Sequence, residues 1–150
     1  MIYNFLFPSK PDDKNISVLL LTFRIVFGVL LMSHGIQKLC NFHELSAVFP
    51  DPIGLGSNTS LILAIFAEFL CSAAFVIGLL YRLATIPMIF TMGVACFVAH
   101  AHDPFSVKEL AFVYLVVFII MYIAGPGKYS IDYVIGKELR RRKEQKNKTI

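Results

Sequence analysis

Four apolar runs account for most of this 150-residue chain, and each is close to the length that crosses a membrane as a helix. A helix needs about 20 consecutive apolar residues to span the hydrocarbon of a bilayer. We place the runs at residues 16–40, 60–80, 83–101 and 107–124, followed by a basic tail at residues 128–150. Lipid offers the backbone no hydrogen-bond partners, so such runs fold as helices. The sequence therefore predicts an all-α, polytopic membrane protein with one domain, an antiparallel bundle of four transmembrane helices.

The charge distribution predicts how this bundle is oriented. The net charge is +4, and most of the basic residues lie in the tail after the fourth run. Cytoplasmic flanks of membrane helices collect Lys and Arg, which explains these residues without a nucleic-acid partner. Only Lys38 and Lys108 lie at the opposite ends of the runs. We therefore expect a multi-pass protein of the inner (plasma) membrane with both termini in the cytoplasm.

Ionisable residues interrupt the apolar runs at a few positions. Arg24, His34 and Lys38 lie in the first run, and Glu68 lies in the second. Charged groups at membrane depth are costly in free energy and usually face a protein interior or a wet cavity. Arg24 has a long side chain that reaches several ångströms along its helix. We therefore expect Arg24 and Glu68 to form an ion pair or to be bridged by water.

Helix geometry predicts that the other polar groups meet in one pocket. With a rise of about 1.5 Å per residue, His34 and Glu68 lie at similar depths below the outer surface. We predict a cluster that handles a ligand or protons in the outer half of the bundle, composed of His34, Lys38, Glu68, His100 and Glu109. Carboxylate and imidazole groups transfer protons, and an ammonium group holds an anionic or carbonyl oxygen. These properties suit a bound quinone, a similar redox headgroup or a lipid.

Each of these residues also has a purely structural interpretation. Arg24 and Glu68 would then stabilise the fold, and Lys38 would extend to the membrane surface. Ser106 and Glu109 match the S-x-x-E pattern of a helix capping box, which gives Glu109 a role at the start of the fourth helix. A backbone carbonyl or a water molecule could satisfy His34.

Metal and cofactor motifs are missing from the sequence. Met88, Met92, Cys96 and His100 follow one another at intervals of four residues, a pattern that could hold Cu(I) but is usually packing. We predict no metal site. Phosphate-binding, dinucleotide-binding and hydrolase motifs are absent. We therefore expect no cofactor in the chain itself and leave open whether it is an enzyme.

The quoted residues also carry a resemblance to the DoxX family of small membrane proteins. It lies in the segment from Arg24 to Lys38, in Glu68 with the following Gly78 and Arg82, and in the turn at His100. The most specific part is a motif like the family's GPG-R/K-x-S-L-D, represented here by Gly125, Pro126, Gly127, Ser130 and Asp132. The resemblance implies a four-helix membrane bundle. It also implies a link to quinone-dependent redox systems, because the family is named for a subunit of such a complex.

Two functions from different classes follow. The first is a membrane subunit of a quinone-linked redox complex, in which a partner protein supplies the redox centre. The second is a non-catalytic scaffold, chaperone or binding protein for lipids or small molecules. Candidate partners are membrane lipids, a redox protein and further copies of the chain.

Overall fold

A computed structural model describes residues 14–148, and the side chains of residues 14–145. Four helical segments in it are long and apolar enough to cross a membrane. The first is α2 (Lys14–Cys40) and the fourth is α7 (Phe105–Ala124). The second comprises α4 (Ser57–Ile65), the π-helical segment η1 (Phe66–Cys71) and α5 (Ser72–Ile77); the third comprises α6 (Tyr81–Val94) and the π-helical segment η2 (Ala95–Ala99). The predicted all-α, polytopic fold is confirmed.

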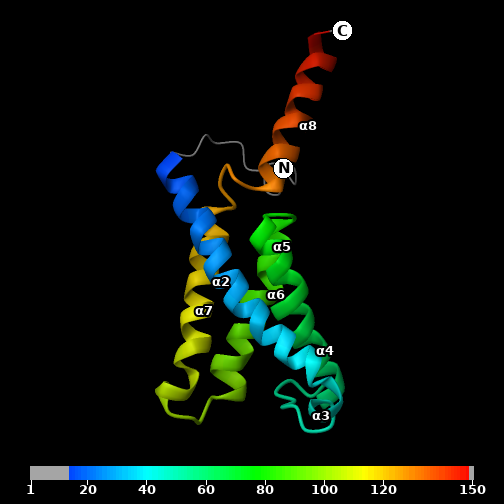
Figure 1. The fold of residues 1–150 in the computed structure, drawn as a ribbon, viewed down its shortest axis with the longest axis vertical. Coiled ribbons are helices and arrows are strands. Elements are labelled where there is room, and N and C mark those ends of the chain that lie inside the picture. The colour runs from blue at the N-terminus through cyan, green and yellow to red at the C-terminus, as the bar shows by residue number, and fades with distance from the viewer. Residues whose placement is uncertain (1–13, 149–150) are drawn as a thin grey trace.

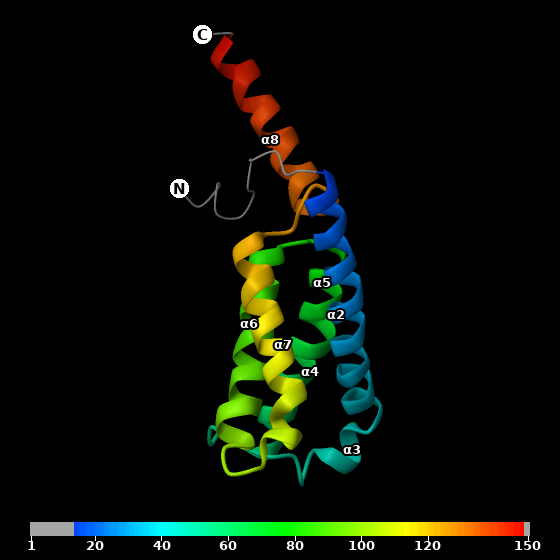
Figure 2. The ribbon, with the colours of Figure 1, turned by 90° about the vertical axis from the view of Figure 1, so that its left-hand side faces the viewer.

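The four spans run alternately up and down (Figure 1). One end of the bundle holds the start of α2, the turn between α5 and α6, and the end of α7; from it the last helix, α8 (Ile131–Lys148), points away (Figure 2). We call this the tail end. The opposite end holds the short helix α3 (Phe42–Leu45) and the turn between η2 and α7. We call it the loop end.

Apolar side chains fill the space between the spans, and many others face outward. Phe75 stacks on Tyr81 with ring centroids 5.0 Å apart and meets Phe118 edge-on at 5.4 Å. Large apolar residues such as Ile120 and Ile123 are exposed on the outer surface. An apolar exterior is the expected surface of a bundle that contacts lipid tails.

The methionine stripe of the third span belongs to the packed interior. Met88, Met92 and Cys96 are 0%, 5% and 2% exposed. Met88 and Met92 pack in the main apolar cluster, where a flexible thioether fills irregular gaps. Among residues 14–148, no group of three or more His, Cys, Asp and Glu side chains is arranged to hold a metal ion.

The spans begin earlier than the hydropathy predicts. The second span starts at Ser57 and ends at Ile77, because Gly78 adopts a left-handed conformation with φ 70°. The connection to the third span is therefore residues 78–80, so the predicted gap between the second and third runs, residues 81–82, is wrong. Tyr81 already begins α6, because the Asp132 carboxylate accepts hydrogen bonds from the N–H groups of Leu80 and Tyr81 at 2.8 and 2.7 Å.

Asp51 orders the long connection at the loop end. Its carboxylate accepts hydrogen bonds from the N–H groups of Leu55 and Gly56 and from the hydroxyl group of Ser60. These bonds lower the pKa of Asp51, with the Ser60 hydroxyl as the largest cause. The connection is thus tied to the first turns of α4, which begins at Ser57.

Candidate functional site

An ion pair between Lys38 and Glu68 lies in the loop-end half of the bundle. The Lys38 Nζ atom donates a hydrogen bond to Glu68 Oε2 at 2.5 Å. The side chain of Glu68 is 6% exposed and that of Lys38 is 24% exposed. A carboxylate this deeply buried is costly unless a cation compensates its charge. Lys38 supplies that cation.

The direction of helical side chains explains why these two residues meet. Side chains on a helix lean toward its N-terminus. The N-terminus of α2 lies at the tail end, so Lys38 leans from the loop end into the bundle. The second span runs the opposite way, so Glu68 leans toward the loop end. The two side chains therefore converge.

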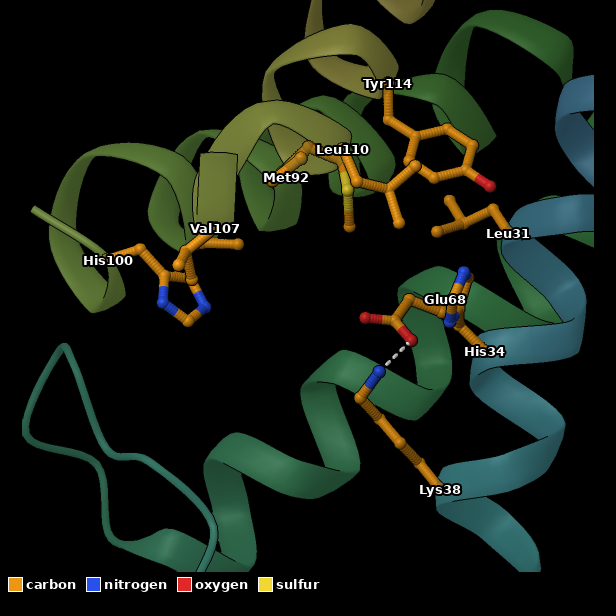
Figure 3. Close-up of a pocket in the computed structure, with 11 residues that line it drawn as sticks. Leu31, His34, Lys38, Glu68, Met92, His100, Val107, Leu110 and Tyr114 are labelled. Carbon is orange, nitrogen blue, oxygen red and sulfur yellow. Dashed lines mark hydrogen bonds and ion pairs between the residues drawn. The ribbon is translucent and has the colours of Figure 1, made fainter. Parts of the chain in front are cut away.

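The ion pair forms part of the wall of a pocket of about 230 Å³ (Figure 3). Ligand-binding pockets typically have volumes of about 300–1,000 Å³, so this one suits a small headgroup rather than a whole lipid. The wall is formed by α2, η1, α6, η2, the turn after η2, and α7; its residues are Leu31, His34, Lys38, Glu68, Met92, Ala95, His100, Val107, Leu110, Ala111 and Tyr114. Mostly apolar walls with a few polar groups are typical of small-molecule sites.

Four of the five residues predicted for the cluster line this pocket. His34, Lys38, Glu68 and His100 are brought together from three different parts of the fold. The His34 ring packs edge-on against Tyr114, with centroids 6.3 Å apart. The His100 Nδ1 atom forms a hydrogen bond with Asp103 Oδ2 at 2.7 Å.

Glu109 does not join the pocket, and this part of the prediction is wrong. The face of α7 toward the pocket carries Val107, Leu110 and Tyr114, which recur at helical spacing, and Glu109 lies outside that face and is exposed. The predicted capping box is also absent. The helix begins at Phe105, directly after Pro104, and no side chain forms a cap hydrogen bond there.

Two features of the pocket have no counterpart in the sequence prediction. Glu68 lies in η1 and Ala95 in η2, so π-helical segments of two neighbouring spans contribute to the same pocket. Such segments are rare and often occur at functional sites. The second feature is Tyr114, which is 4% exposed and brings a phenol group to the pocket. Its spacing of seven residues from Val107 on α7 is the signal that could have identified it.

Gly35 brings the backbones of α2 and η1 into direct contact beside Glu68. A Cβ atom at Gly35 would lie 2.7 Å from the Phe69 nitrogen and 2.8 Å from the Glu68 carbonyl carbon. Both are backbone atoms, so the helices would have to separate. Because Gly35 carries only a hydrogen atom as its side chain, α2 and η1 can approach closely, and this approach sets how deeply Glu68 lies in the bundle.

The Gly35→Ala variant is expected to lose about 1–3 kcal/mol of unfolding free energy, the usual cost of overpacking a core. Denaturant unfolding in detergent micelles measures this loss. Gly93→Ala is the matched control, because a Cβ atom there would meet only the Leu115 Cδ1 atom at 4.0 Å. Equal stabilities of the two variants would show that the contact at Gly35 is not tight.

Arg24 lies in a different cluster, and its predicted ion pair with Glu68 is wrong. The guanidinium group donates hydrogen bonds to four backbone carbonyl oxygens, at 2.6 to 3.1 Å, belonging to Phe75, Val76, Pro126 and Tyr129. Arg24 is 1% exposed. Its side chain leans toward the N-terminus of α2, which is the tail end and thus away from Glu68.

The segment from Gly125 to Asp132, which carries the predicted family motif, closes the tail end around Arg24. Gly125, with φ 86°, ends α7, and Gly127 is also left-handed. The Ser130 hydroxyl group accepts a hydrogen bond from the Tyr133 N–H at 3.1 Å and so caps α8. Ser130 is thus the N-terminal cap of the tail helix.

Asp132 joins this segment to the turn between the second and third spans. Its N–H donates to the Gly78 carbonyl at 2.9 Å, and its carboxylate accepts from Leu80 and Tyr81. Burial raises the pKa of Asp132 above its ordinary value, although these two N–H groups oppose the shift. The motif residues therefore act on the fold, at the end of the bundle opposite the pocket.

Neither the curated proteins nor the solved structures give a significant match. The DoxX family model matches residues 19–101, which include Arg24, Lys38 and Glu68 and more than half of the chain. The chain belongs to the DoxX family of membrane proteins.

Proposed function

We propose that the loop-end pocket binds the headgroup of a quinone and that the protein is the membrane subunit of a quinone-linked redox complex. The observation that carries the proposal is the ion pair between buried Glu68 and partly exposed Lys38 at the wall of an apolar pocket. A quinone ring requires apolar walls, and its oxygens require hydrogen-bond partners. Both requirements are met within one pocket of headgroup size.

The polar groups have distinct roles in this proposal. Lys38 donates a hydrogen bond to a ligand oxygen, and Glu68 exchanges a proton with it. One oxygen of the Glu68 carboxylate binds Lys38, while Figure 3 shows the other pointing into the pocket. A partner redox protein exchanges electrons with the bound ring, since the sequence carries no flavin-binding or metal-binding motif.

Ligand binding by the purified full-length protein tests the proposal. Lipids extracted from the preparation are assayed for quinone, and a short-tailed benzoquinone is titrated calorimetrically into the protein in detergent. The chain has six Tyr and no Trp, so quenching of tyrosine fluorescence gives a second signal, to which Tyr114 contributes. Saturable binding supports the proposal. Absence of quinone from the extract together with no binding in the titration overturns it.

A non-catalytic scaffold or binding protein is the second candidate function. Arg24 and Asp132 at the tail end favour it, because their side chains form hydrogen bonds with backbone groups and so stabilise the bundle. The titration separates the two candidates. Binding of phospholipid headgroups in preference to the quinone would favour the second.

We also propose that the protein lies in the plasma membrane. In the proposed orientation the loop end faces outward and both termini lie in the cytoplasm. The basic residues of α8 lie beyond the tail end, on the side where positive charge is retained. The native cysteines provide a test, because Cys40 is exposed near the loop end while Cys71 and Cys96 are buried.

A membrane-impermeant maleimide is therefore expected to label Cys40 in intact cells, and Cys40→Ser is expected to abolish the labelling. A cysteine introduced at exposed Lys143, in a Cys40→Ser background, is expected to react only after the cells are permeabilised. Labelling of that cysteine from outside would reverse the proposed orientation.

A further inference from the structure

We infer that the pocket binds the reduced, hydroxylated form of its quinone more tightly than the oxidised form, because His100 offers it a hydrogen-bond acceptor. This inference rests on the function proposed above. It adds which redox form the site selects and assigns His100 and Asp103 as the residues that determine the selection.

The pairing of His100 with Asp103 fixes which ring nitrogen carries the proton. An ionised carboxylate can only accept hydrogen bonds, so Nδ1 of His100 must donate to Asp103 Oδ2 across the 2.7 Å between them. In the neutral imidazole, the other nitrogen, Nε2, is then an acceptor. Figure 3 shows this nitrogen on the side of the ring that faces the pocket and Glu68.

The turn that carries His100 is held from several sides. The Asp103 N–H donates to the His100 carbonyl at 3.2 Å. From α7, Lys108 Nζ donates to the carbonyls of His100 and Ala101 at 3.4 and 3.2 Å. The charged groups around the ring are thus Asp103 and Lys108 at the rim, and Lys38 and Glu68 on the pocket wall. These contacts hold the backbone of the turn, while the ring itself contacts Asp103, and the His100 and Asp103 side chains are 42% and 47% exposed.

The ion pair does not discriminate between the two redox forms. Lys38 can donate to a ligand oxygen of either form, and Glu68, which exchanges a proton in the proposed function, can accept from a hydroxyl group when ionised or donate to a carbonyl oxygen when protonated. His100 does discriminate. A hydroxyl group of the reduced ring donates to Nε2, whereas a carbonyl oxygen of the oxidised ring would place two lone pairs against each other with no proton between them.

Calorimetric titration of the full-length protein in detergent measures the preference. The probes are a short-tailed benzoquinone and its chemically reduced benzoquinol, compared without oxygen in the same mildly alkaline buffer. We expect the benzoquinol to bind roughly three- to tenfold more tightly, the effect of one hydrogen bond. Equal affinity, or tighter binding of the benzoquinone, overturns the inference and leaves the proposed function standing. Failure of both probes to bind overturns both.

Two variants test the assigned residues. In Asp103→Asn the side-chain amide can donate as well as accept, so the tautomer of His100 is released and the affinity ratio is expected to fall toward one. His100→Gln is expected to have the same effect, because an amide offers either a donor or an acceptor. His102→Gln is the matched control, since His102 is exposed and does not line the pocket. An unchanged ratio in Asp103→Asn would overturn the inference.

Discussion

The Arg24→Met variant is expected to lose roughly 3–5 kcal/mol of unfolding free energy, which would lower the melting temperature by about 10 °C or more. Methionine keeps most of the volume but removes every hydrogen bond that the guanidinium donates. Four carbonyl oxygens from two separate segments would then lose a donor inside the bundle. Thermal and denaturant unfolding in detergent micelles measure the loss.

Arg142→Met is the matched control, because Arg142 is exposed and forms only a surface ion pair with Glu138. Surface pairs contribute about 0–1 kcal/mol, so this variant should remain close to the wild type. Arg24→Lys should recover only part of the stability, because a single ammonium group cannot reach all four carbonyls. If Arg24→Met were as stable as Arg142→Met, the structural role assigned to Arg24 would be wrong.

The Glu68→Gln variant is expected to keep the fold and lose ligand affinity. Glutamine has the same shape but no charge and no proton to exchange. Hydrogen bonds to charged groups are worth about 1.5–3 kcal/mol, so the affinity for the ligand should fall roughly ten- to hundredfold. Lys38 loses its counter-ion but is already 24% exposed, so its flexible chain can turn toward water. The stability should therefore change by only about 1 kcal/mol.

Calorimetric titration and thermal unfolding, run on the same preparations, separate these two effects. Glu109→Gln removes a carboxylate that is exposed and does not line the pocket, so it should change neither affinity nor stability. A Glu68→Gln protein that unfolds but binds normally when folded would assign Glu68 to the structure instead.

The spans and most of the pocket could be predicted from the sequence, because both follow from the cost of polar groups in lipid. Hydropathy gives the four helices, and the length of each helix gives the depth of its polar residues. That was enough to bring His34, Lys38, Glu68 and His100 together.

The partners of Arg24 could not be predicted in this way. Counting residues gave the depth of the guanidinium but ignored the lean of helical side chains, which sends Arg24 and Glu68 in opposite directions. The true partners are backbone carbonyls, which every residue carries, so no residue type in the sequence marks them. The prediction for Glu109 was wrong for a related reason, because depth alone does not say which face of α7 a residue occupies.

The π-helical segments were also beyond prediction. A change from α-helical to π-helical hydrogen bonding shifts the register of a span without altering its apolar composition. The surroundings of Glu68 and Ala95 therefore depend on tertiary contacts, such as the approach of α2 at Gly35.

The hydrogen bonds from Arg24 to four backbone carbonyls have a consequence for how the protein is made. Two of the acceptors, Pro126 and Tyr129, are synthesised 102 and 105 residues after Arg24. When the first span leaves the ribosome, its guanidinium has none of these acceptors, and it gains the last of them only when translation passes residue 129. Insertion of the first helix and synthesis of the segment after α7 are therefore separate events in biogenesis. The nascent bundle stays incomplete until that segment has been made.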